Sequence, residues 1–289
     1  MEDILRPIYQ ERTSQKNTLG VLIVEKNQRD TPATDTFDAI LFIVIKDDEQ
    51  PVFVKHYTYG KQIAALYIVT ELQLRKWILM GTNRKIFDWL LNGRILFDRN
   101  EFVTQLKNEL IEFPANERKR KMGIEFAKLI RRYVDGKSFF ENKHYLDAFN
   151  YIVHSLHHLA RLSVIENGFH PEVTVWHQVK QIEPEIFKLY DELVNSSETI
   201  DKRLELLFLA SEFLIHSKTK SGISHLIEIL SEKDYWSFND MIIHEELSIY
   251  SVDLSMLLSY LINKNLIEVV NLETKGKQLY HRFYMVKKK

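Results

Sequence analysis

Carboxylates that stand beside apolar runs are the residues of this chain best suited to chemistry. Asp38 lies at the start of an apolar run that ends at Lys46, and Asp35 precedes that run in a polar stretch. Asp98 closes a shorter apolar segment further along the chain. Grouped carboxylates can hold Mg²⁺ ions that orient phosphates and neutralise charge as it develops. Asp38, Asp35 and Asp98 are therefore the candidate catalytic residues, and Asp38 is the candidate metal ligand.

The residue two positions after Asp38 weakens this interpretation. Residues i and i+2 of a strand share one face, so a second carboxylate beside Asp38 would stand at position 40, where the chain has Ile40. A single carboxylate makes a poor Mg²⁺ site, because octahedral oxygen coordination usually needs more acids or substrate phosphates. The alternative role for Asp38 is structural, as a hydrogen-bond acceptor at the start of a strand.

The first third of the chain has the pattern of an α/β domain that would position these carboxylates. Short apolar runs predict strands, and Thr70 with Gln73 three residues later predicts the start of a capped helix that ends at Gly81. The expected strands cover residues 20–25, 37–46, 52–59, 64–69 and 94–98, and the expected helices cover 4–17, 70–80 and 83–91.

From residue 101 onward the apolar period is helical and predicts an antiparallel helical bundle. The expected helices cover residues 101–112, 115–135, 143–166, 172–181, 184–193 and 199–217. Lys121, Lys128 and Arg132 lie near one another on the second of these helices, which makes them candidates for phosphate binding. A basic run is more often a helix face in contact with solvent, and we favour that interpretation here. His154 and His158 are four residues apart and could share a metal, or they could be structural histidines.

The C-terminal part has the element order of a winged helix. Residues 218–222 are the expected linker, helices are expected over 223–231, 238–247 and 251–264, and a hairpin is expected over 267–286. Ten Lys/Arg stand against nine Asp/Glu from 218 to 289, a net charge of only +1, which is low for a protein that neutralises several phosphates. We therefore favour intramolecular or protein docking over DNA binding. The candidate nucleic-acid contacts are Lys264, Lys275, Lys277 and Arg282.

The order of a strand, a polar loop, an Asp-led strand and the closing segment Gly93–Asp98 resembles the polymerase-β-type nucleotidyltransferase fold. With the helical run around Tyr145–Phe149, the chain resembles the YgxA-like group of nucleotidyltransferase-like proteins. This resemblance implies a multi-domain α+β chain with a nucleotidyltransferase-like mixed sheet (1–113), a helical substrate-binding-type domain (114–218) and a winged helix-turn-helix domain (219–289). It also implies Gly-Ser after the first strand, where this sequence has Val24–Asn27.

Composition limits the remaining possibilities. The chain has 289 residues, a net charge of −1 and no cysteine, so disulfides and thiolate metal sites are excluded. The N-terminus is acidic without an apolar core, unlike a signal peptide, and no apolar run approaches the roughly 20 residues of a membrane span. We expect a cytoplasmic bacterial protein that binds no membrane.

The functional prediction from the sequence is a pseudoenzyme. It would have a degenerate metal site and act as a binding or regulatory protein whose partner is a nucleotide, a protein or a second copy in a homodimer. The alternatives are an active Mg²⁺-dependent nucleotidyltransferase acting on a small molecule or protein, and a DNA-binding regulator.

Overall fold

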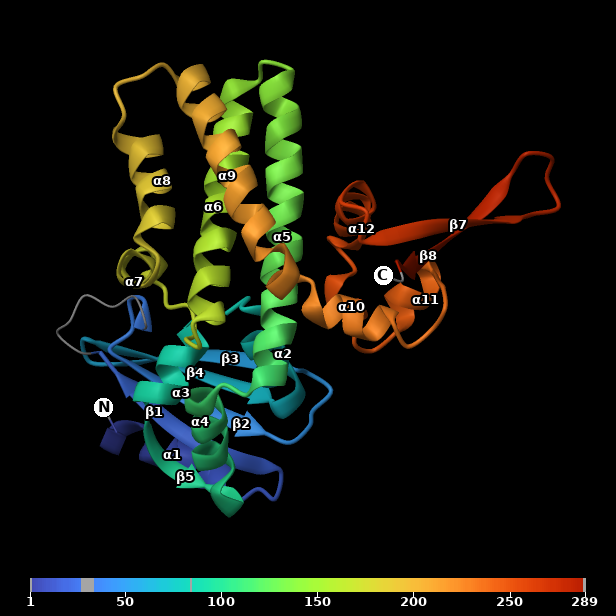
Figure 1. Cartoon of the computed structure of the whole chain (residues 1–289). Helices are drawn as coiled ribbons and strands as arrows, with labels where there is room; N and C mark the ends of the chain where they lie inside the picture. Colours follow the sequence, from blue (N-terminus) through green and yellow to red (C-terminus); the bar gives the residue numbers. More distant parts are fainter. Residues whose placement is uncertain (1, 27–33, 84, 288–289) are drawn as a thin grey trace. The chain divides into compact units, whose positions relative to one another are not determined.

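The computed structural model of the chain describes residues 2–26, 34–83 and 85–287, which form two compact units, Met1–Pro114 and Ala115–Lys289. The first unit is a five-stranded mixed sheet with strand order β3-β4-β2-β1-β5 (Figure 1). The strands are β1 (Thr18–Glu25), β2 (Ala39–Ile45), β3 (Val52–Tyr59), β4 (Gln62–Thr70) and β5 (Arg94–Asp98). All five strands expected from the sequence are present.

The central strand β2 is buried along its whole length, as a continuous apolar run predicts. It pairs parallel with β4 and antiparallel with β1. The helices of the first unit are α1 (Glu2–Thr13), α2 (Glu71–Met80), α3 (Lys85–Asn92) and α4 (Phe102–Glu112), with a 3₁₀ turn η2 (Arg99–Glu101). Helices α2, α3 and α4 bury their apolar side chains against one face of the sheet, and α1 contributes Leu5 to the core on the other face.

Local caps fix the ends of α2 as the sequence predicts. The Thr70 hydroxyl accepts a hydrogen bond from the Gln73 backbone N–H at 3.3 Å, which satisfies a donor at the helix start. Gly81 ends the helix in the left-handed region, with φ of 62°. Glycine adopts this conformation without the steric cost that a side chain would add.

The second unit begins with a bundle of long helices (Figure 1). They are α5 (Ala115–Glu141), α6 (Tyr145–Glu166), α7 (Val175–Ile182), α8 (Pro184–Asn195) and α9 (Ile200–Gly222). Helix α5 runs six residues beyond its predicted end at 135. Among the described residues, no helix combines the length and apolar character needed to cross a bilayer.

The prediction of a linker at residues 218–222 is wrong, because this segment is the last turn of α9. The Lys218 ammonium forms ion pairs with Glu166 and Glu183, each at 2.6 Å. The Thr219 hydroxyl lies 3.0 Å from the hydroxyl of Tyr260. These tertiary contacts keep the helix intact through a sequence whose composition is typical of a loop.

The C-terminal module, defined here as residues 224–286, follows without a break. It contains α10 (Ser224–Leu230), β6 (Trp236–Ser237), α11 (Phe238–Ile243), the 3₁₀ turn η3 (Ser248–Tyr250), α12 (Leu254–Asn263), β7 (Ile267–Glu273) and β8 (Tyr280–Val286). The last two strands form the wing hairpin, with β6 added to β8 at the other edge. The winged-helix prediction is confirmed in element order, and the overall α+β fold class is confirmed with it.

Candidate functional site

Asp38 extends the pairing between β2 and β4. Its carboxylate Oδ2 accepts a hydrogen bond from the Ile63 backbone N–H at 2.8 Å. Its backbone N–H donates to the Ile63 carbonyl at 2.8 Å, and its carbonyl accepts from the Lys26 N–H at 2.8 Å. The side chain therefore satisfies a backbone donor at the start of the sheet, which is the structural role that the sequence left open.

The other two candidate carboxylates are also engaged. Asp35 adopts a left-handed backbone conformation and forms an ion pair with Lys85. Asp98 caps the start of α4, because its two carboxylate oxygens accept from the backbone N–H groups of Val103 at 2.8 Å and Thr104 at 3.0 Å. The Thr104 hydroxyl adds a third hydrogen bond at 2.7 Å.

Strand register separates Asp98 from Asp38. Asp98 pairs with Gly20 on β1, whereas the start of β2 pairs with Glu25 at the other end of that strand. Five residues of extended chain span about 17 Å. These two carboxylates therefore stand at opposite ends of the sheet and do not share a metal in this arrangement.

The position beside Asp38 belongs to the core. Ile40 is 1% exposed and lies in the apolar cluster that also holds Phe42 and Trp89. Glu25 ends β1 and pairs with Ala39. It belongs to the segment Val24–Asn27, where the resemblance implies Gly-Ser in active transferases. Asn27 of that segment lies outside the described residues. Within residues 2–26, 34–83 and 85–287, no group of three or more His, Asp or Glu side chains is arranged to hold a metal ion.

The basic candidates on α5 lie in different environments, and only Lys121 is buried. Lys121 is 5% exposed, and its Nζ lies 3.2 Å from Nδ1 of His170. Burial lowers the pKa of Lys121 to about 8. Lys128 lies 3.5 Å from a Glu125 carboxylate oxygen, and the Arg132 guanidinium lies over the ring of Tyr151. The expectation of a solvent-exposed stripe is thus wrong for Lys121, while phosphate binding by these residues stays a prediction.

Glu125 is the polar centre of the bundle that the sequence analysis did not identify. Its carboxylate is nearly buried and lies 2.7 Å from Nδ1 of His158 and 3.7 Å from a guanidinium nitrogen of Arg161. His158 therefore has a structural hydrogen-bond partner, while burial lowers the pKa of His154. The available signal was the spacing of Glu125 from Lys121 and Lys128, which places all three on neighbouring turns of α5.

Helix α12 leaves one polar face exposed in the C-terminal module. Ser255, Ser259 and Asn263 are exposed along it, while Leu254, Leu257, Leu258 and Leu261 on the opposite face are buried. The Lys264 ammonium lies over the ring of Tyr260, and the Arg282 guanidinium lies over the ring of Tyr284. Lys275 and Lys277 are exposed in the turn between β7 and β8.

The same module is docked onto the helical bundle of its own unit. Arg131 of α5 bonds to Asp253 at 3.2 Å, just before α12, and Arg120 pairs with Glu246 at 3.2 Å. A Cβ atom added to Gly123 would lie 2.1 Å from the hydroxyl oxygen of Tyr250, so this glycine permits close packing. Docking uses α10, η3 and α12, and Glu228 of α10 also pairs with Lys119 of α5 at 3.1 Å. An isolated glycine inside a helix was the sequence signal that could have revealed it.

Comparisons with known proteins agree with this architecture. Residues 1–118 match the family described as nucleotidyltransferase-like, residues 119–218 match the YgxA-like substrate binding domain, and residues 224–286 match a helix-turn-helix domain. The uncharacterized protein YgxA of Bacillus subtilis (strain 168) is 54% identical over 288 residues, which cover 100% of this chain and 98% of that protein. The chain belongs to the YgxA-like family of nucleotidyltransferase-like proteins.

A solved crystal structure supports the family assignment over nearly the whole of this YgxA-like chain. The crystal structure of a nucleotidyltransferase-like protein from Exiguobacterium sibiricum 255-15 is 38% identical, with a TM-score of 0.87 and coverage of 99% of each chain. The resemblance drawn from the sequence is therefore confirmed at the level of family and fold.

Proposed function

We propose that this YgxA-like protein is a binding or regulatory protein built on a nucleotidyltransferase-like fold, rather than an active transferase. The observation that carries the proposal is the position of Asp38 and Ile40. The Asp38 carboxylate accepts the Ile63 N–H at 2.8 Å, and Ile40, where a second carboxylate would stand, is buried in the core.

Metal-dependent transfer would need oxygen ligands that converge on one point. Asp35 pairs with Lys85, and Asp98 caps α4 at the far end of the sheet. The three candidate carboxylates are thus each engaged in a contact that stabilises the fold. This arrangement supports binding without nucleotidyl transfer.

The alternative is an active Mg²⁺-dependent transferase, and one substitution separates the two. Asp38→Asn keeps an oxygen that accepts the Ile63 N–H but removes the negative charge that a metal ligand needs. Calorimetric titration with Mg²⁺-ATP and Mg²⁺-GTP is expected to give the same result for wild type and Asp38→Asn. Mg²⁺-dependent nucleotide binding or transfer that Asp38→Asn abolishes would establish the enzyme instead.

DNA binding by the C-terminal module is a second candidate function, supported by the exposed face of α12. Ser255, Ser259 and Asn263 can hydrogen-bond to base edges, and the wing cations Lys275 and Lys277 can contact phosphates. The docking contacts of Asp253 and Tyr260 lie on a different side of the helix, so they leave this face open.

Fluorescence anisotropy with a labelled duplex tests this candidate. The double substitution Lys275→Ala/Lys277→Ala is expected to weaken binding and to reduce its salt dependence by roughly two phosphate contacts. Lys188→Ala, an exposed cation on α8, is the matched control and should leave affinity unchanged. If the duplex does not bind at low salt, this candidate is dismissed.

A homodimer also remains a proposal. Leu206, Leu209 and Phe213 form an exposed apolar stripe on α9, with exposed fractions of 64%, 65% and 74%. Large exposed apolar patches often mark interaction sites. Light scattering of wild type and Leu209→Glu would show whether two copies associate through this stripe.

A further inference from the structure

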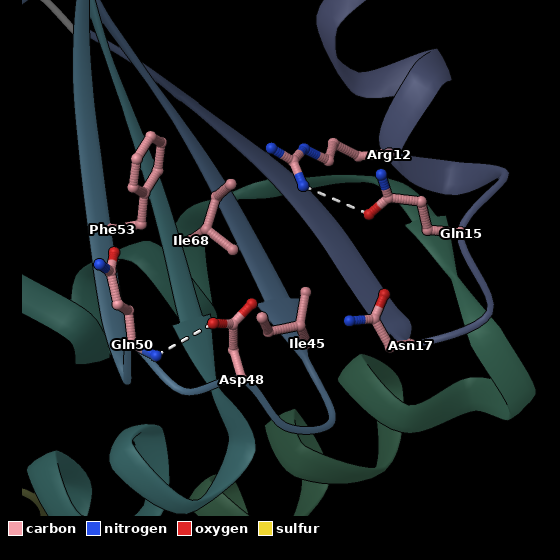
Figure 2. Close-up of a pocket in the computed structure, with 8 residues that line it drawn as sticks. All are labelled: Arg12, Gln15, Asn17, Ile45, Asp48, Gln50, Phe53 and Ile68. Carbon is pink, nitrogen blue, oxygen red and sulfur yellow. Dashed lines mark hydrogen bonds between the residues drawn. The ribbon is translucent and has the colours of Figure 1, made fainter.

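A pocket of about 160 Å³ lies in the first unit at the end of the sheet away from Asp38 (Figure 2). Ile45, at its floor, ends β2, whereas Asp38 precedes the start of that strand. Seven residues of extended chain separate the two points by about 23 Å. The pocket is therefore distinct from the place where a nucleotidyltransferase would hold its metal ions.

The floor of the pocket is apolar and the rim is polar. Ile45 and Ile68 are 4% and 5% exposed, and the half-buried ring of Phe53 stands beside them. The rim carries one cation, one anion and three carboxamides: Arg12, Asp48, Gln15, Asn17 and Gln50. A concave site with an apolar base and a few polar groups at its edge is the usual form of a small-molecule site.

The rim groups are held in place by local hydrogen bonds. The Arg12 guanidinium donates to the Gln15 side-chain oxygen at 3.3 Å, and an Asp48 carboxylate oxygen accepts from the Gln50 backbone N–H at 3.0 Å. Arg12 reaches in from the end of α1, and Asp48 stands on the turn after β2, across the isoleucine floor (Figure 2). A ligand that uses both must offer acceptors at one edge and donors at another.

We propose that this pocket binds the base of a guanine nucleoside. Guanine presents O6 and N7 as acceptors, which match an arginine, and its N2 amino group and N1–H as donors, which match a carboxylate. The purine plane can lie on the isoleucine floor and beside the ring of Phe53. The volume corresponds to about five water molecules, which suits a single base with its ribose in solvent.

Adenine and free amino acids fit this arrangement less well. Adenine turns an acceptor nitrogen toward a carboxylate in the same pose, so Asp48 disfavours it. A free amino acid carries its carboxylate and ammonium on one carbon, and it would need Arg12 and Asp48 to converge rather than to face each other across the floor.

Calorimetric titration of the full chain with guanosine tests the proposal. Asp48→Asn keeps an acceptor for the Gln50 N–H, so the turn should persist, but it replaces one acceptor for the base by a donor. We expect guanosine to bind Asp48→Asn at least about tenfold more weakly than wild type, which corresponds to about 1.4 kcal/mol. Asp47→Asn, an exposed neighbour that does not line the pocket, should bind as wild type does.

Wild type is also expected to prefer guanosine over adenosine. No saturable guanosine binding, equal affinity for the two nucleosides, or equal affinity of Asp48→Asn and wild type would each overturn the proposal. Binding of leucine in place of guanosine would overturn the assigned ligand class. None of these outcomes affects the proposed loss of the metal site, which is tested at Asp38.

Discussion

Substitution of Gly123 by alanine tests how the C-terminal module is held on α5. The added Cβ would lie 2.1 Å from the Tyr250 hydroxyl oxygen and 2.9 Å from its Cζ, much closer than real Cβ contacts. The Tyr250 side chain is 1% exposed, and its hydroxyl lies 2.8 Å from Nδ1 of His225. The ring therefore has to move out of a packed site and away from its hydrogen-bond partner.

The magnitude follows from three contributions. Overpacking a buried contact costs about 1–3 kcal/mol, and loss of the Tyr250–His225 hydrogen bond costs about 0.5–1.5 kcal/mol. Replacing glycine by alanine inside a helix returns about 0.5–1 kcal/mol. The net expectation for Gly123→Ala is a destabilisation of about 2 kcal/mol, concentrated at the contact between the module and the bundle.

Urea denaturation measures the size of the destabilisation, and amide hydrogen exchange shows whether it is concentrated in the C-terminal module. Gly123→Ala should lower the free energy of unfolding and speed amide exchange in residues 224–286. Gly136→Ala is the control on the same helix, because its nearest neighbours are Tyr151 and Phe208 of the bundle. It should leave exchange in the module unchanged.

A double substitution shows whether the clash with Tyr250 causes the destabilisation. Tyr250→Phe removes the atom closest to the added Cβ, so Gly123→Ala should cost less in the Tyr250→Phe background than in wild type. If Gly123→Ala is as stable as wild type and leaves exchange in residues 224–286 unchanged, the docking described here is refuted.

Three further predictions concern buried ionisable groups. Burial lowers the pKa of Lys121 from 10.5 to about 8, so the unfolded chain binds more protons than the folded chain between these two pH values. The free energy of unfolding should therefore rise with pH across this window by up to about 3 kcal/mol. Urea denaturation at several pH values measures this rise, and Lys121→Met should flatten it. Burial also lowers the pKa of His225 below 6.5, although Glu246 opposes the shift. The stability of the C-terminal module should therefore fall as the pH drops below 6.5, which amide exchange rates of the module measure. His225→Gln should abolish this pH-dependent loss of stability. Glu125→Gln removes the carboxylate charge that faces Lys128 and Arg161, and it should cost roughly 3 kcal/mol in urea denaturation.

The first unit could be predicted well from the sequence because its signals are local. Apolar runs of strand length marked all five strands, and Thr70 and Gly81 marked the ends of α2 through backbone chemistry within a few residues. Strand register could not be predicted, because it depends on pairing between distant segments. The distance between Asp38 and Asp98 is a consequence of that register, and so only the structure shows that the two carboxylates stand apart.

Tertiary partners account for what the sequence analysis missed in the second unit. Helical periodicity placed Lys121 on the polar side of α5, but it could not supply His170, which lies against it in the fold. The segment 218–222 has the composition of a loop, yet Lys218 is held by two carboxylates from other helices. In both cases a long-range contact outweighs a weak local preference.

The continuity of α9 has a consequence for any ligand of the second unit. Gly222 lets this helix pack directly on Phe126 of α5, since an added Cβ would lie 2.5 Å from the ring. Thr219 contacts Tyr260 of α12, so α5, α9 and α12 are joined by direct packing rather than by a flexible linker. A displacement of α5 by a ligand would therefore be passed through packed side chains to α12 and its exposed face. By linkage, DNA bound to that face and a ligand bound in the bundle would change each other's affinity by the same factor. Such coupling between the bundle and the winged helix would suit the proposed regulatory role, which needs no catalytic metal.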